Sequence, residues 1–137
     1  MQQASRLGMV VSVRSRFTLA QVNAGATVVA ATAGMAYRIV DVTLISVGGA
    51  AAGGTSVDLI GTRSAATVRP IVAAVAALTQ SAVVKPNTTN VTVLADGASF
   101  TALDANTAIT IGKQSGGSDL TVSTHFDLIL SYAAERP

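Results

Sequence analysis

The chain has 137 residues, of which 50% are hydrophobic, 12% charged and 4% aromatic, and its formal net charge is +2. This length supports one hydrophobic core and is too short for two, so we predict a single domain. The high apolar content and low net charge exclude an intrinsically disordered chain. The absence of cysteine excludes a disulfide scaffold and any cysteine-ligated metal site.

The apolar residues are mostly small, with long Ala and Val tracts, and the mean hydropathy is +0.53. Small side chains bury little area each, so the core of one subunit contributes only modest stability. A hydropathy this high predicts apolar surface that is covered by another subunit or by a partner. The charge-free stretches 17–37, 42–57 and 70–84 are too short or too rich in polar residues and glycine to predict a membrane span.

The N-terminal segment is basic, because Arg6, Arg14 and Arg16 all precede the first acidic residue, Asp41. Arg14 and Arg16 interrupt the first apolar stretch, so we predict no signal peptide and expect the protein to be made in a cytoplasm. We predict an extended arm over residues 1–16, ahead of one domain over residues 17–137. The three arginines are candidate contacts to an acidic protein surface, and a solvated terminus is the alternative. The sequence has no dense stripe of Lys and Arg, so we predict no nucleic-acid partner.

Short runs of β-branched residues and Thr, separated by Gly, Asn and Asp about every ten residues, predict an all-β fold. The clearest strand alternates Phe126, Leu128 and Leu130 with Asp127 and Ile129. In a second strand, Val40, Val42 and Leu44 form one face, and the other face carries Ile39 and Asp41. The predicted strands are Thr18–Val22, Thr27–Thr32, Tyr37–Val47, Thr55–Ile60, Val91–Leu94, Thr107–Ile111 and Phe126–Tyr132.

Two segments are harder to assign. The run Gly48–Gly54 has few side-chain anchors and predicts a mobile loop that provides either reach or close packing. Residues 67–84 fit both strand and helix periodicities. We favour a strand over Thr67–Ala74 followed by one short helix over Ala76–Val83, because Ala and Leu favour helices and Pro86 ends them.

The search for catalytic residues gives one weak candidate. His125 lies two residues before Asp127, so on a strand both side chains would share a face, as a base and its orienting carboxylate would. We favour a polar strand edge over catalysis and predict no enzyme activity. Asp41, Asp58 and Asp127 could also meet across strands, but the aromatic residues that line glycosidase clefts are nearly absent. No motif predicts a cofactor or a metal site.

Three stretches carry a resemblance to a known family: QVNAGATVVAATAGMAYRIVDVTLISVGGAAAGGTSVDLIG, VLADGASFTALDANTAITIG and THFDLILSYAAE. Within residues 17–135 the order of these strands and of the Gly-Gly loop resembles the small cement, or head decoration, proteins of tailed bacteriophages. The resemblance rests on element order rather than on a chemical motif, so no site residues are carried over.

The resemblance implies a jelly-roll-like β fold, often trimeric, that binds the outside of the capsid where major capsid proteins meet and stabilises the head. The expected location is the virion, after synthesis in the cytoplasm of a bacterial host. On this hypothesis Arg6, Arg14 and Arg16 anchor an extended arm to acidic groups of the major capsid protein, and a homotrimer makes three such contacts at once. The alternative is a head-fibre or tail-associated adhesion module that binds carbohydrate, which would need aromatic stacking platforms.

Overall fold

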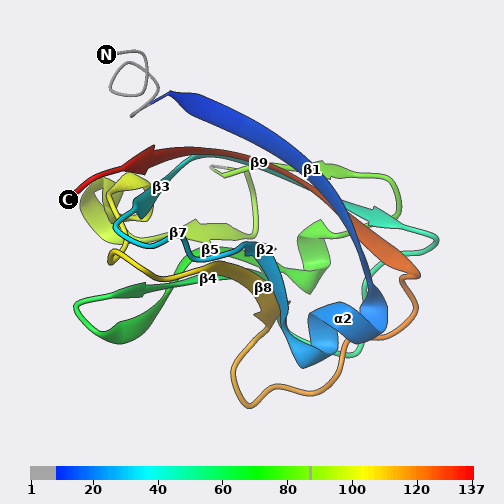
Figure 1. Ribbon diagram of the computed structural model, residues 1–137. Helices are drawn as coiled ribbons and strands as arrows, with labels where there is room; N and C mark the ends of the chain where they lie inside the picture. The colour runs from blue at the N-terminus through cyan, green and yellow to red at the C-terminus, as the bar shows by residue number, and fades with distance from the viewer. Residues whose placement is uncertain (1–8, 87) are drawn as a thin grey trace.

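The computed structural model describes residues 9–86 and 88–137, whose strands form two antiparallel sheets packed face to face (Figure 1). The chain is therefore an all-β sandwich, as the strand pattern predicts. One sheet has the order β1 (Val10–Thr18), β9 (His125–Glu135), β3 (Ala36–Val47) and β6 (Val83–Val84). The other has the order β2 (Ala26–Val29), β8 (Ile109–Lys113), β4 (Ser56–Arg63), β5 (Ala66–Ala74) and β7 (Val91–Val93).

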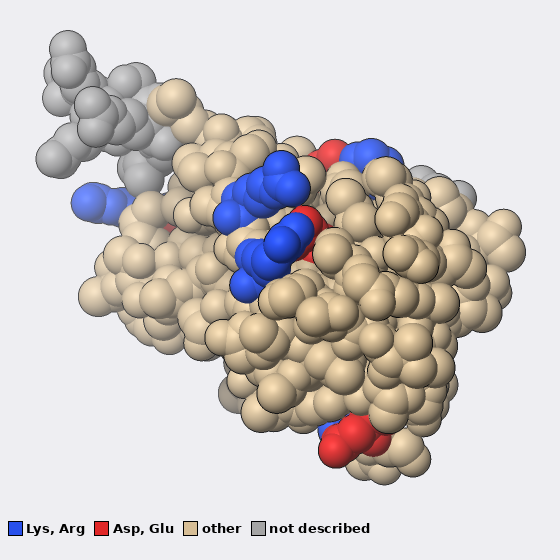
Figure 2. All heavy atoms as spheres, turned by 90° about the vertical axis from the view of Figure 1, so that its right-hand side faces the viewer, with Lys and Arg blue, Asp and Glu red and all other residues tan. Residues whose placement is uncertain are grey.

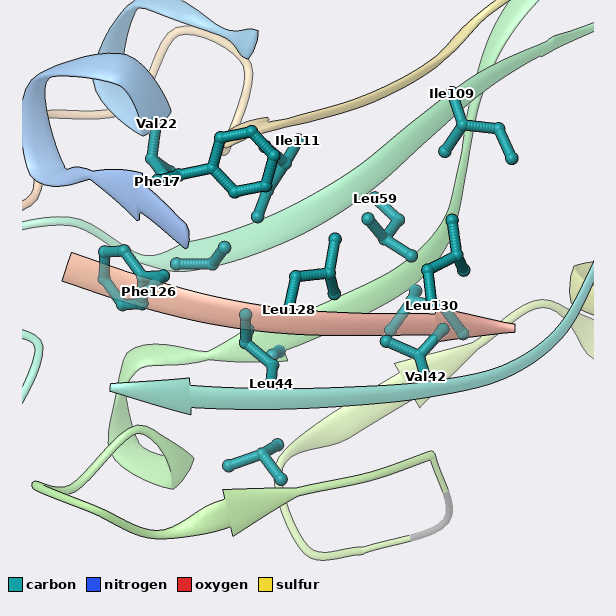
Figure 3. Close-up of a cluster of buried hydrophobic side chains, with 14 of the residues drawn as sticks. Phe17, Val22, Val42, Leu44, Leu59, Ile109, Ile111, Phe126, Leu128 and Leu130 are labelled. Carbon is teal, nitrogen blue, oxygen red and sulfur yellow. The ribbon is translucent and has the colours of Figure 1, made fainter. Parts of the chain in front are cut away.

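The core lies between the sheets and is built mainly from aliphatic side chains (Figure 3). Phe126, Leu128 and Leu130 alternate along β9 and are each at most 1% exposed, so the predicted strand and its buried face are confirmed. Leu59 and Ile111 meet them from the opposite sheet. Burial of one such side chain contributes about 1.5–3 kcal/mol, so this inner face is a main source of stability.

A β-bulge in β3 changes which side chains face the core. Ile39 lies opposite Tyr132 and Asp41 lies opposite Ser131, so Val40 is the extra residue on β3. The bulge reverses the alternation of side chains along β3. Ile39 is therefore 1% exposed, although the sequence pattern placed it on the other face of the strand from Val42 and Leu44. The predicted face was wrong at this point, because pairing with β9 sets a bulge and strand periodicity alone does not predict it.

Residues 19–24 form a helix, α2 (Leu19–Ala24), in place of the strand over Thr18–Val22 that the sequence predicts. The Thr18 side chain accepts a hydrogen bond from the Gln21 backbone at 3.2 Å, and the Gln21 side chain accepts one from the Thr18 backbone at 2.8 Å. This reciprocal capping box starts the helix, whose residues Leu19, Ala20 and Gln21 favour helix formation. Val22 is fully buried, so the helix also closes one end of the core.

Only part of the prediction for residues 67–84 is confirmed. β5 covers the predicted strand, but the predicted helix over Ala76–Val83 is wrong. One 3-10 turn, η1 (Val75–Ala77), leads instead into β6. The backbone of Leu78 and Ser81 is hydrogen-bonded to Ala51 and Ser46, which holds this segment along β3 and prevents a helix. The second 3-10 segment, η2 (Ala95–Phe100), precedes β8.

The glycine-rich run 48–54 packs closely against residues 118–124. Ala52 and Thr121 form an isolated antiparallel bridge, with backbone hydrogen bonds of 3.2 and 2.8 Å. A Cβ atom at Gly48 would lie 2.1 Å from the Thr124 hydroxyl oxygen, so only glycine fits there. Of the two roles considered for this run, the structure therefore supports close packing.

The boundary expected between an arm and a domain falls inside β1. Residues 10–16 pair antiparallel with β9 along their whole length, so they belong to the sandwich rather than to a separate extended arm. Arg6 and the rest of residues 1–8 lie outside the described residues. In residues 9–86 and 88–137, no helix combines the length and hydropathy needed to cross a membrane.

Candidate functional site

The predicted contact residues Arg14 and Arg16 lie on the outer face of the four-stranded sheet, beside Asp127. Strand register places Arg16 opposite Asp127 and Arg14 opposite Ile129. Arg16 donates to both carboxylate oxygens of Asp127, from Nε at 2.7 Å and from Nη2 at 2.9 Å. Arg14 donates from Nη2 at 3.4 Å. The two arginines thus share one carboxylate, and this group of three is called the Arg-Asp cluster below.

Burial and charge distinguish the members of the Arg-Asp cluster. The Asp127 side chain is 6% exposed, whereas those of Arg14 and Arg16 are 69% and 55% exposed. The hydrogen bonds from Arg16 hold the pKa of Asp127 below its usual value against the opposing effect of burial. The same contact raises the pKa of Arg16. Two guanidiniums against one ionised carboxylate leave one positive charge on the surface.

Figure 2 shows basic side chains around an acidic one near the middle of a mostly uncharged face, with other charged side chains at its margins. Six ion-pair contacts among the described residues involve eleven of the sixteen charged side chains of the chain. Arg63 donates to the carbonyls of Thr101 and Ala102, and Asp104 accepts from the backbone of the turn at Ser64. Most charged groups are therefore used inside the molecule.

The sequence pattern associated Asp127 with His125, but the structure associates it with the two arginines. His125 begins β9 and lies opposite Thr18 and Val47. The hydrogen bonds that Asp127 accepts among the described residues come from Arg14 and Arg16, so the carboxylate does not orient the imidazole. The partners of Asp127 were not predictable from local spacing, because Arg16 is 111 residues away in the sequence.

The three aspartates considered as possible paired carboxylates bind different basic side chains and do not meet one another. Asp58 is 1% exposed, accepts from the Ser56 hydroxyl at 2.6 Å and pairs with Arg69. Asp41 is bound to Lys85 at 3.2 Å, and Asp127 belongs to the Arg-Asp cluster. The aspartates therefore form separate structural ion pairs. No group of three His, Asp or Glu side chains within residues 9–86 and 88–137 is arranged to hold a metal ion.

A small gap of about 10 Å³ lies between the sheets near β6 and β7. Its lining is mostly core residues, including Leu44, Ile71 and Leu128. The two charged lining residues are Asp58 and Lys85, and both are held in the ion pairs described above. The gap is thus a space in the apolar core whose charged groups already have partners, and it lacks the convergent polar groups of a substrate site.

None of the five aromatic side chains, all of which are described, is exposed. Phe17, Tyr37 and Phe126 are buried, and Phe100 and Tyr132 pack against the core. The Tyr37 and Tyr132 rings meet edge to face with centroids 5.4 Å apart, and the Tyr37 hydroxyl donates to the Ala30 carbonyl at 2.7 Å. The chain thus has no fully exposed aromatic ring on which a sugar could stack.

The exposed apolar side chains lie mainly at sheet margins. Met9, Val10 and Val11 are 55%, 53% and 46% exposed at the start of β1, and Val83 on β6 is 60% exposed. β1 and β6 are the two edges of the same sheet. Some of the apolar residues that raise the mean hydropathy are thus exposed at strand edges, where backbone groups are available for pairing.

Three comparisons, with protein-family models, with curated proteins and with solved structures, each found no match for this chain.

Proposed function

We propose that this protein is a structural component of a tailed-bacteriophage virion. In this proposal it is a cement, or decoration, protein that binds the outside of the major capsid protein shell and stabilises the head. The observation that carries the proposal is the distribution of charge. Most charged side chains form ion pairs within the molecule, while apolar side chains remain exposed at the edges of the four-stranded sheet. This arrangement suits a protein that associates rather than one that transforms a substrate.

The sheet topology supports the resemblance to decoration proteins. The order β1-β9-β3-β6 faces the order β2-β8-β4-β5, with β7 added at the edge. Apart from the β4–β5 hairpin, neighbouring strands are not consecutive in the sequence, as in the double Greek key of a jelly roll. A jelly roll presents flat sheet faces and strand edges to its surroundings, which are the surfaces that a protein needs to lie on a shell.

The outer face of the four-stranded sheet is the surface that we assign to the capsid. The Arg-Asp cluster leaves one positive charge there, and Arg14 is bound to Asp127 by a single long contact of 3.4 Å. The other donors of its guanidinium can bind a carboxylate of the major capsid protein. Asp127 then acts as a positioning residue, because it holds both arginine side chains against the sheet.

A reconstruction of the virus particle by electron cryomicroscopy tests this proposal. We expect density for the sandwich on the outer surface of the head, at junctions between capsomers, with the four-stranded sheet facing the shell. Particles that lack the protein should lose their genome at a lower temperature, and added purified protein should restore the difference. Density confined to a tail or a fibre, or no density on the particle, would refute the proposed function.

A further inference from the structure

β1 is the only edge strand longer than four residues among the strands of the described residues. The other edge strands are β6, with two residues, β2, with four, and β7, with three, whereas β1 has nine. Short edge strands are a usual protection against unwanted strand pairing, and β1 lacks this protection. In Figure 1, β1 runs along the outer margin of the sandwich, with β9 as its neighbour.

Side chains along β1 add to this exposure. Val10 on the outer face and Val11 on the inner face are about half exposed, as is Met9 just before the strand. The only charges on β1 are Arg14 and Arg16, and Asp127 neutralises one of them. The strand thus offers a nine-residue backbone edge, exposed valines and little net charge, which are the properties of a strand that accepts another strand.

From these properties we infer that β1 pairs antiparallel with β1 of a second copy, which joins two four-stranded sheets into one. A strand of similar length can pair with most of this edge, and β1 itself is the one edge strand longer than four residues among the described residues. The first half of β1 is apolar and the second half carries the two arginines. In a twofold antiparallel contact, the apolar half of each strand lies beside the basic half of the other, so the two strands are complementary.

The arginines select the register of this pair. A twofold axis at Val13 places Arg14 opposite Ser12 and Arg16 opposite Val10 of the second copy, so no arginine lies directly opposite another. An axis at Arg14 would place the two Arg14 side chains directly opposite each other. An axis at Ser12 would pair only residues 10–14 of β1, against 10–16 for the axis at Val13.

The pairing is independent of the proposed capsid function, and its symmetry has a consequence for stoichiometry. A twofold β1 contact joins copies in pairs and does not build the closed trimer that the family resemblance implies. An edge contact buries less than the ~1,600 Å² of a standard interface, so we expect a dissociation constant on the order of 10 μM.

Sedimentation velocity on the purified full chain tests the pairing over a concentration series that spans the expected dissociation constant. We expect a monomer–dimer equilibrium. Val11→Lys should weaken it at least about tenfold, because an inward-pointing lysine opposes edge pairing. The matched control is Val83→Lys, the same change at an exposed valine on the opposite edge of the sheet, and it should leave the equilibrium unchanged. A persistent monomer, a trimer, or equal effects of both variants would overturn the inference.

Cysteine cross-linking tests the register even if Val11→Lys fails to fold. The chain has no cysteine, so a single introduced thiol reports one contact. Val13→Cys should form a disulfide-linked dimer under mild oxidation, because its Cα lies about 5 Å from its symmetry mate in the inferred register. Ser15→Cys is the control, with its mates about 13 Å apart along the strands. Equal cross-linking at both positions, or none at Val13→Cys, would overturn the pairing.

Discussion

Arg16 lies directly opposite Asp127 across the β1–β9 pair and binds both oxygens of its carboxylate, at 2.7 and 2.9 Å. The contact attaches the edge strand β1 to the sheet through side chains as well as through the backbone. It also buries a carboxylate on an outer sheet face, where a free aspartate would be solvated. The pair therefore links the stability of β1 to the ionisation of Asp127.

The first prediction concerns acid stability. Hydrogen bonds from Arg16 lower the folded-state pKa of Asp127 below its ordinary value of 3.8, so the ionised carboxylate stabilises the folded state. This stabilisation is fully present above pH 3.8 and is lost as the pH falls through the lowered folded-state pKa. Asp127→Asn should therefore reduce Tm at neutral pH. The difference from the wild type should shrink below pH 3.8 in melts followed by circular dichroism. A difference that stays constant into strong acid would contradict the role of this group.

The second prediction contrasts a buried ion pair with an exposed one. Asp58 is 1% exposed, so Arg69→Met leaves an unpaired buried carboxylate and should lower the unfolding free energy by about 3 kcal/mol. Lys85→Met is the matched control, because its partner Asp41 is 56% exposed, and it should cost less than about 1 kcal/mol. Urea denaturation measures both values. Equal losses would mean that burial of Asp58 does not determine the effect.

The all-β class was predictable because long strands such as β9 carry a regular alternation that only one buried face explains. The bulge at Val40 and the partners of Asp127 were not predictable, since both depend on pairing between segments far apart in the sequence. Helix α2 lies between these cases. Its capping box at Thr18 and Gln21 is visible in the sequence, but the β-branched residues around it indicated a strand.

The sequence predicted two residues of the candidate site, Arg14 and Arg16, but not their arrangement around Asp127. A basic N-terminal segment indicated Arg14 and Arg16 as surface contacts, and both are exposed. Their neutralising partner on β9 changes what they can do, because only one net positive charge remains. Strand pairing of residues 10–16 also replaces the expected free arm with a fixed array of side chains. Charge composition alone did not contain this information, since it does not specify which strands become neighbours.

The third prediction tests the glycine packing at the 48–54 run. Gly48→Ala places a Cβ atom 2.1 Å from the Thr124 hydroxyl oxygen at a φ of +79°, so it combines a clash with backbone strain. We expect a loss of about 2–4 kcal/mol in unfolding free energy. Gly34→Ala is the control for backbone strain alone. Its φ is +75° and no atom lies within 4 Å, so it should cost only about 1–2 kcal/mol. Chemical denaturation measures the unfolding free energy of both variants. Equal losses would contradict a role for close packing at Gly48.

The fourth prediction tests the assignment of the outer sheet face to the capsid. Arg14→Gln removes a positive charge that contributes one long contact to Asp127 and leaves the bidentate Arg16 contact in place. We expect a nearly unchanged Tm and a weaker attachment to heads, measured by co-sedimentation with particles that lack the protein. Attachment of the wild type should also weaken as salt is added, because an exposed charge contact is screened.

Arg136→Gln is the matched control for this fourth prediction, since it removes the same charge from an exposed position beyond the end of β9. It should leave attachment unchanged. Equal losses with both variants would show that attachment responds to total charge rather than to the face that carries the Arg-Asp cluster. Full attachment of Arg14→Gln would instead place the capsid contact on another surface. A decoration protein with so few free charges should depend strongly on the position of each one, and comparison of these two arginines measures that dependence directly.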